Sequence, residues 1–223
     1  MLAARLLDGN LVSESVCRRG DGAASLASME TRPATTLTDG RIVVRRYRPS
    51  DAAALKEAID ASVEHLRPWM PWAADEPQPL EVKQQLIARW DETWDASEEF
   101  IYAVLAADDG SVIIGGSGLH PRIGPGGMEI GYWVRPERAR CGIATAAARL
   151  LTSAAFQLEG IDRVEIHHDR ANVASTGVPR RLGFRFVEER AEQVDAPGKT
   201  GFEWVWQVDP ASWVRADQAM APA

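Results

Sequence analysis

The stretch from Met128 to Leu151 constrains the fold of this chain more than any other. It begins with residues that favour a β-strand, Ile130 to Val134. Pro136 ends that strand, because a proline has no N–H group to offer a neighbouring strand. A basic turn over 135–140 then leads to Gly142, where an Ala- and Leu-rich helix opens. The pattern predicts a strand, a basic loop of small residues and a helix in immediate succession.

A helix that opens in this way is suited to binding a phosphate group. Gly142 and Ala144 leave the backbone uncovered, so N–H groups of the first turn can face an anion. The helix dipole adds partial positive charge at the same end. The residues therefore indicate a place to hold a pyrophosphate, while an ordinary strand-to-helix turn stays open as the alternative.

Composition excludes several classes of protein. The 223 residues are 45% hydrophobic and 26% charged, which are globular values. The net charge of −7 argues against general nucleic-acid binding, which needs a concentration of positive charge. No apolar run approaches the ~20 residues of a membrane span, and the first residues lack a secretory pattern. We expect a cytoplasmic protein with neither nucleic acid nor a membrane as its partner.

A metal site is not expected. Cys17 and Cys141 lie far apart in the sequence, so neither a disulfide framework nor a metal-ligand spacing is present. His167 and His168 are adjacent in a predicted strand, where successive side chains point to opposite faces. They are therefore not expected to share one ion.

The chain is expected to form one domain over residues 36–213. Residues 1–35 show no sustained hydrophobic period and predict a weakly ordered extension, while 214–223 predict a C-terminal tail. Met29 stands just before the domain, so a start of translation there is an alternative to Met1.

Within the domain, strands and helices alternate, which predicts an α/β (α+β) fold. Strands are expected at 37–47, 100–107, 112–119, 130–134, 164–168, 184–194 and 202–208. Helices are expected from a cap at Ser50 to Leu66, from Pro79 with Val82, Leu86, Trp90 and Trp94 on one face, over 142–159 up to Gly160, and between Asn172 and Gly183. Residues 210–213 predict one helical turn at most.

The segment 65–73 is rigid and apolar, because it holds two prolines and two tryptophans. Two interpretations stay open for it. It forms either a loop packed onto the core or one wall of a substrate pocket, lined by Trp69, Met70 and Trp72.

Three motifs in order resemble the GNAT N-acetyltransferases. Glu-Ile-Gly-Tyr-Trp-Val followed by Cys-Gly-Ile-Ala-Thr is similar to the acyl-CoA loop of that family, Arg/Gln-x-x-Gly-x-Gly/Ala. Leu-x-Pro-Trp-Met-Pro-Trp, and Asn-x-x-Ser ahead of Arg-Leu-Gly-Phe, are similar to its ribosomal-protein (RimJ/RimL-like) branch. Three positions depart from the pattern: Ala139 stands where the family has Arg or Gln, Arg140 where this branch often has Gly, and Pro179 interrupts the last motif.

The resemblance covers about residues 37–213 and implies a single-domain fold with a mixed, mostly antiparallel sheet. This sheet would be splayed near the opening strand and flanked by helices. The resemblance also implies acetyl-CoA as the donor and a primary amine as the acceptor, most readily the α-amine of a protein or peptide. The implied cofactor-binding residues are Trp133, Val134, Arg135, Arg138, Arg140, Cys141, Gly142, Ile143, Ala144, Thr145 and Asn172.

Catalytic roles follow from the same resemblance. Ser175 would protonate the leaving thiolate, and Glu129 or Glu188 would accept a proton from the amine, directly or through a water. The alternatives are a capping or solvent-facing hydroxyl for Ser175 and a solvated acidic patch for the glutamates. Two other functions stay open: acetylation of a small amine, such as an antibiotic or a polyamine, and a CoA-binding regulatory module without catalysis. A homodimer also stays open.

Overall fold

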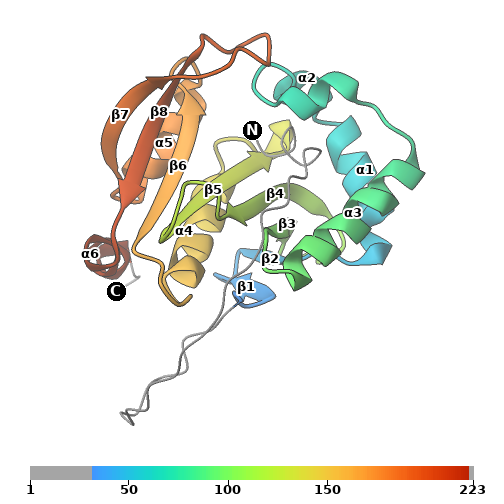
Figure 1. Ribbon diagram of the computed structural model, residues 1–223. Coiled ribbons are helices and arrows are strands. Elements are labelled where there is room, and N and C mark those ends of the chain that lie inside the picture. Colours follow the sequence, from blue (N-terminus) through green and yellow to red (C-terminus); the bar gives the residue numbers. More distant parts are fainter. Residues whose placement is uncertain (1–31, 221–223) are drawn as a thin grey trace, which may run out of the picture.

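The computed structural model describes residues 32–220, which form one eight-stranded sheet with helices on both faces (Figure 1). The strands are β1 (Thr36–Thr38), β2 (Ile42–Arg46), β3 (Phe100–Ala106), β4 (Ile113–His120), β5 (Gly127–Val134), β6 (Arg163–Asp169), β7 (Arg185–Ala191) and β8 (Phe202–Val208). Their order across the sheet is β1-β2-β3-β4-β5-β6-β8-β7. The expected mixed, mostly antiparallel sheet is confirmed, because β5 and β6 form the one parallel pair among these strands.

The sheet opens between β5 and β6. Only Gly127 to Glu129 of β5 pair with β6, at Arg163 to Glu165. Beyond Glu129, the backbone of β5 continues beside β4 alone, up to Val134. The splay expected near this strand is therefore present, and it leaves one side of residues 130–134 without a neighbouring strand.

Helices cover the two faces of the sheet over two hydrophobic clusters. They are α1 (Ala52–Asp60), α2 (Val63–Leu66), α3 (Leu80–Asp95), α4 (Ile143–Ala155), α5 (Val173–Arg181) and α6 (Pro210–Met220), with 3-10 turns at Pro49–Asp51, Pro71–Asp75 and Pro136–Arg138. Alternate residues of β3 divide between the clusters: Tyr102 packs with α4, and Ile101 packs with α1 and α3. Within residues 32–220, no helix is long and apolar enough to cross a membrane.

The first helix begins later than predicted. Ser50 lies inside a 3-10 turn, and α1 starts at Ala52. The Asp51 carboxylate accepts two hydrogen bonds from Arg45, at 2.7 and 2.9 Å, which hold this turn against β2. The predicted helix also breaks before Ser62, whose buried hydroxyl donates to the carbonyl of Ala58 at 2.6 Å. The side chain therefore satisfies a carbonyl where the helix ends.

The buried face of α3 differs from the predicted stripe by one position. Trp90 and Trp94 are buried as expected, but Lys83 and Ile87 take the places predicted for Val82 and Leu86. Lys83 is buried because its ammonium group pairs with the buried carboxylate of Glu76. A charged residue in the core is tolerated only with such a partner, which hydrophobic periodicity does not reveal.

The two helices beside the open strand follow the prediction more closely. Gly142 precedes α4 with a positive φ of 79°, and α4 ends at Ala155, one turn before the predicted stop at Gly160. Asn172 caps α5, because its side-chain oxygen accepts the Ser175 N–H at 3.2 Å. Pro179 is accommodated inside the helix.

The C-terminal prediction was wrong for residues 214–220. They belong to α6, an eleven-residue helix, rather than to a tail. Trp213 anchors it: the side chain is buried, and its indole N–H donates to the Ser153 hydroxyl of α4 at 3.1 Å. At the other end of the chain, residues 1–31 of the predicted extension lie outside the described part. Its last residues pack on the domain, where the Thr35 carbonyl accepts the Arg46 N–H at 2.8 Å.

Candidate active site

Two cavities meet where β5 leaves β6. We call the larger one, of about 560 Å³, the loop cavity, because residues 138–140 and 142–145 line it. The smaller one, of about 320 Å³, is the carboxylate cavity, which Glu129, Glu192 and Glu203 line. The two share five lining residues: Trp69, Met70, Tyr132, Asn172 and Ser175. A group bound in one cavity therefore reaches the other at this junction.

The loop cavity brings most of the predicted cofactor-binding residues together. All of them line it except Arg135 and Cys141. A Cβ at Gly142 would have nothing closer than an Arg41 nitrogen at 4.0 Å, so glycine is needed there for its positive φ and not for space. This conformation turns the chain into α4, whose first N–H groups lack partners within the helix.

Arg135 and Cys141 lie elsewhere. The Arg135 guanidinium pairs with Glu57 of α1, at 2.6 and 2.9 Å, and so turns toward the helices on the other side of the strand end. Cys141 is exposed, with its sulfur 3.6 Å from the Ala139 carbonyl. Neither residue lines the loop cavity, and the cofactor contact implied for each stays a prediction.

Two arginines that the sequence did not single out also line the loop cavity. Arg41 comes from the turn between β1 and β2, and Arg181 comes from the end of α5. With Arg138 and Arg140, four arginines line the cavity. The Arg41 guanidinium also pairs with Asp39 at 2.9 Å, and that of Arg181 donates to the Gly177 carbonyl at 3.1 Å. No local pattern marks Arg41, because its place depends on how the first hairpin sits beside α4.

The junction positions Ser175 between the cavities. Its N–H is used by the Asn172 cap, and its carbonyl accepts the Tyr132 hydroxyl at 3.3 Å. Ser175 is half-buried in the wall that the two cavities share, and its side chain is hydrogen-bonded with Tyr132. A group bound at the junction would therefore meet Ser175 and Tyr132 together. Burial holds the pKa of Tyr132 above its usual range, so the phenol remains protonated at neutral pH.

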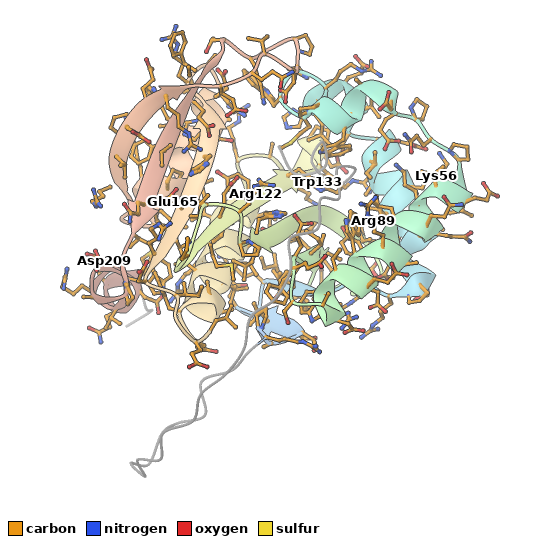
Figure 2. All side chains as sticks on the ribbon, in the orientation of Figure 1. Lys56, Arg89, Arg122, Trp133, Glu165 and Asp209 are labelled. Carbon is orange, nitrogen blue, oxygen red and sulfur yellow. The ribbon has the colours of Figure 1, made fainter. Side chains whose placement is uncertain are left out.

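Glu129 lies in the carboxylate cavity, but its carboxylate has a low affinity for protons. Arg122 donates to its two carboxylate oxygens, from Nη2 at 2.6 Å and from Nε at 2.8 Å. Arg122 lies in the loop before β5, and Trp133 belongs to the last part of β5 (Figure 2). Burial alone would raise the pKa of Glu129, but the hydrogen bonds and charge of Arg122 outweigh it and lower the pKa to about 2. The carboxylate is therefore a fixed anion at neutral pH and a weak proton acceptor.

Glu188 lies outside both cavities. It is exposed on β7, next to an irregularity between Phe186 and Glu188 where the pairing with β8 shifts by one residue. Glu192, which sequence reasoning missed, reaches the carboxylate cavity from just beyond the end of β7. Burial raises the pKa of Glu192 to about 7, and a hydrogen bond with Glu203 and the charge of Glu203 act in the same direction. Glu192 is therefore the carboxylate of this cavity whose proton affinity suits general base catalysis near neutral pH.

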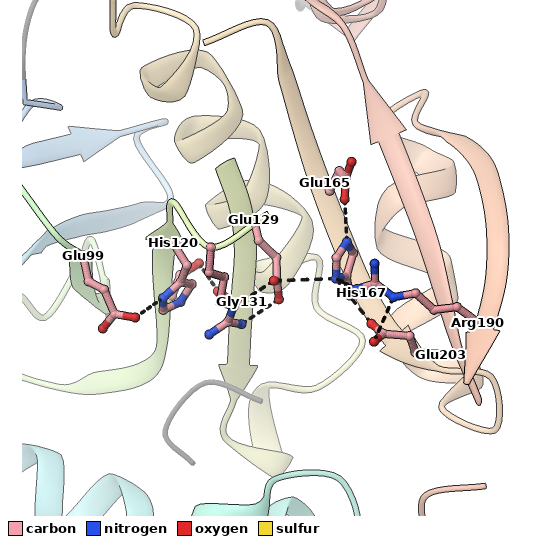
Figure 3. A network of polar contacts seen from close by, with 10 residues as sticks. Glu99, His120, Glu129, Gly131, Glu165, His167, Arg190 and Glu203 are labelled. Atoms are coloured by element: carbon pink, nitrogen blue, oxygen red, sulfur yellow. Dashed lines mark hydrogen bonds and ion pairs between the residues drawn. The ribbon is translucent and has the colours of Figure 1, made fainter. Parts of the chain in front are cut away.

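A wider polar network joins the carboxylate cavity to neighbouring strands (Figure 3). His167 of β6 lies 2.7 Å from Glu165, 3.3 Å from Glu203 and 3.6 Å from Glu129, measured between ring nitrogen and carboxylate oxygen. His168 makes different contacts, since it accepts the Trp206 indole N–H at 3.0 Å. In the part of the chain that the structure describes, no group of three or more His, Cys, Asp or Glu side chains is arranged to hold a metal ion.

The three predicted pocket residues of 65–73 separate. Trp69 and Met70 lie at the junction of the two cavities. Trp72 instead lines a third cavity of about 360 Å³ beneath α1 and α3, where it meets Trp133 edge to face at 6.5 Å. Proline at position 71 starts a 3-10 turn, which carries Trp72 to the other side of the segment.

Comparisons with known proteins identify the family. The family model described as "Acetyltransferase (GNAT) domain" matches residues 41–185. The Bacillus subtilis (strain 168) protein named "Putative ribosomal N-acetyltransferase YdaF" is 32% identical over 151 residues, which are 67% of this chain and 81% of that protein.

Solved structures share the fold. One described as "Probable acetyltransferase" has a TM-score of 0.72 and 27% identity, and the match covers 80% of this chain and 98% of that one. Mycobacterium smegmatis RimJ, solved in complex with CoA-disulfide, has a TM-score of 0.68 over 84% of this chain and 93% of its own. At 19% identity, that second likeness concerns the fold alone.

Proposed function

This chain belongs to the GNAT family of N-acetyltransferases, in its RimJ/RimL-like branch, and we propose that it acetylates the α-amine of a protein or peptide. The acetyl group comes from acetyl-CoA, and the amine attacks it directly while donor and acceptor are bound together. The observation that carries this proposal is the meeting of the loop cavity and the carboxylate cavity at Ser175.

The loop cavity fits the donor. The first N–H groups of α4 and the guanidinium groups of Arg41, Arg138 and Arg140 provide positive charge for its phosphates. Trp133 and Val134 lie beyond the last β5–β6 pair, so their backbone can bond the pantetheine amides as a missing strand would. Acetyl-CoA supplies the thioester; these residues bind and orient it toward the junction.

The carboxylate cavity fits an amine that arrives as a cation. Glu192 accepts one proton from the ammonium group, which frees the nitrogen lone pair. The nitrogen then forms the new C–N bond as the C–S bond breaks. Ser175 donates a proton to the departing sulfur and regains one as the nitrogen loses its second. One thiol and one amide result, and one proton passes to solvent.

The loop between β7 and β8 supports a chain end as the acceptor. It reaches across to the end of α2 at the upper side of the view in Figure 1, where the Gly198 N–H donates to the Pro68 carbonyl at 2.8 Å. A Cβ at Gly198 would lie 2.7 Å from that carbonyl oxygen, so glycine permits the contact. The bridge stands next to Trp69 and Lys199 of the carboxylate cavity, and it favours a narrow chain terminus over an internal segment.

The name of the Bacillus subtilis relative refers to the ribosome. On that ground, we include a ribosomal protein as the acceptor in this proposal and place the enzyme in the cytoplasm.

The test is calorimetric titration with acetyl-CoA and with desulfo-CoA, followed by an acceptor panel. We expect micromolar binding of both ligands and thiol release with peptides that have a free N-terminus. Release only with polyamines or an aminoglycoside would replace the peptide by a small amine. Binding without release for any amine would indicate a regulatory module, and no binding would overturn the donor site.

A further inference from the structure

We propose that Glu203 is a positioning residue that acts through Glu192: fixed as an anion by Arg190, it makes Glu192 the proton acceptor of the carboxylate cavity. This inference rests on the proposed function for its role in catalysis. Its structural basis is a pair of carboxyl groups in which only one member contacts cations.

The sheet register fixes Glu203. Arg190 of β7 is its cross-strand partner, and the two strands hold Arg190 Nε 3.3 Å from Glu203 Oε1. From the other side, His167 Nδ1 lies 3.3 Å from Glu203 Oε2, and Arg190 Nη2 lies 3.1 Å from the same imidazole nitrogen (Figure 3). The Glu203 side chain is only 9% exposed. Arg122 adds a more distant positive charge toward it.

Glu192 has a different environment. It shares a hydrogen bond with Glu203. The charge of Lys199 lowers the pKa of Glu192, but the Lys199 ammonium group lies 2.5 Å from the carboxylate of Asp195. Two carboxyl groups that share a hydrogen bond do not both ionise easily, so the pair retains one proton over a wide pH range. The guanidinium group of Arg190, which contacts Glu203, decides which member holds that proton.

The directions of the pKa shifts agree with this asymmetry. Burial opposes ionisation of Glu203, but the hydrogen bond from Glu192 and the charges of His167 and Arg190 lower its pKa. Burial and the neighbouring anion raise the pKa of Glu192 to about 7. Glu203 thus remains an acceptor of hydrogen bonds, and Glu192 gains and loses the proton near neutral pH.

The experiment is a carboxyl ¹³C NMR titration of the full chain labelled at glutamate. A carboxyl resonance with a midpoint near about 7 is expected, and Glu192→Gln identifies it by removing it. Glu203→Gln should lower that midpoint by more than about one pH unit, since the neighbouring anion is gone. Glu188→Gln is the matched control on the same hairpin; being outside the cavity, it should leave the midpoint unchanged.

Arg190→Gln distinguishes an effect of the Arg190 charge on the carboxyl pair from a loss of the hairpin structure. Loss of the cation should raise the midpoint of the pair, whereas a disturbed hairpin would bring it toward the ordinary glutamate value of about 4.3. An unchanged midpoint in Glu203→Gln, or no carboxyl group of the parent chain titrating above about 6, would overturn the inference. A correct titration in a chain that acetylates no amine would instead refute the proposed function and leave the pair as described.

Discussion

The ion pair between Glu129 and Arg122 should give this enzyme a stability that acid removes. Glu129 is 8% exposed, and Arg122 holds its two carboxylate oxygens at 2.6 and 2.8 Å. Burial by itself would raise the pKa of Glu129, but Arg122 lowers this pKa from 4.5 to about 2. The substitution Glu129→Gln tests this contribution, because it preserves the shape of the side chain and removes its charge.

The magnitude follows from linkage between protonation and folding. A pKa lowered from 4.5 to about 2 in the folded state corresponds to about 3 kcal/mol of unfolding free energy at pH 7. Because the folded-state pKa is the lower one, this contribution is complete above about 4.5 and is lost as the pH falls toward about 2. At pH 3, about 1.4 kcal/mol should remain.

The assay is urea denaturation of the parent chain and of Glu129→Gln between pH 3 and pH 7. The substitution also leaves Arg122 without its anion, and any destabilisation from this that does not depend on pH is the same at pH 3 and pH 7. The tested quantity is therefore the difference: the unfolding free energy should fall by about 2 kcal/mol more at pH 7 than at pH 3. Glu64→Gln is the control, because Glu64 also pairs with an arginine, at 2.7 Å, but its side chain is 88% exposed. If Glu129→Gln lowers the unfolding free energy equally at the two pH values, Arg122 does not lower the pKa of Glu129 as described.

Three further predictions concern the donor site, the acid and the last helix. Gly142→Val should weaken acetyl-CoA binding by at least about tenfold in calorimetry. Gly160→Val is the control, because Gly160 has a similar positive φ and open space around it, and it should leave binding intact. Equal effects of the two substitutions would show that the start of α4 has no special role in binding. Ser175→Ala should lower kcat at least about a hundredfold with unchanged acetyl-CoA affinity, and an unchanged rate would exclude the serine. Trp213→Ala should reduce the unfolding free energy by about 3 kcal/mol in urea, and a loss under about 1 kcal/mol would mean that α6 contributes little.

Local signals were enough to predict the part of the site that is continuous in sequence. The strand ended by Pro136 and the glycine at position 142 depend on backbone chemistry within a few residues, so the loop cavity could be anticipated. Asn172 is a similar case, since a helix cap depends on the first turn alone. Ser175 lies in the same turn, but its role was suggested by the resemblance to the family and not by a local signal.

The carboxylate cavity could not be predicted in this way. It depends on β8 lying between β6 and β7, which brings Glu203, Arg190 and His167 together from three strands. The pairing of β7 with β8 also shifts after Phe186. Glu188, which the resemblance suggested, lies outside the cavity, and Glu192 lines it instead. Arg122, which makes Glu129 a weak base, likewise comes from a loop that no motif connects with the strand.

Helix ends were misjudged where side chains replace backbone contacts. Asp51 and Ser62 each satisfy groups that a longer helix would have used. Residues 214–220 were predicted as a tail but form the second part of α6. Their helix depends on Trp213 packing against Phe184 at 6.3 Å and on Arg149 of α4 bonding Asp217 at 2.7 Å. These are tertiary contacts, and a local hydrophobic period does not report them.

The most direct test of this account uses one peptide with a free N-terminus and an internal lysine, incubated with the enzyme and isotopically labelled acetyl-CoA. Fragmentation mass spectrometry then locates the label. A single labelled acetyl group on the α-nitrogen is expected. Label on the lysine alone would contradict this expectation. So would the absence of label from every peptide tested, if the enzyme binds acetyl-CoA under the same conditions.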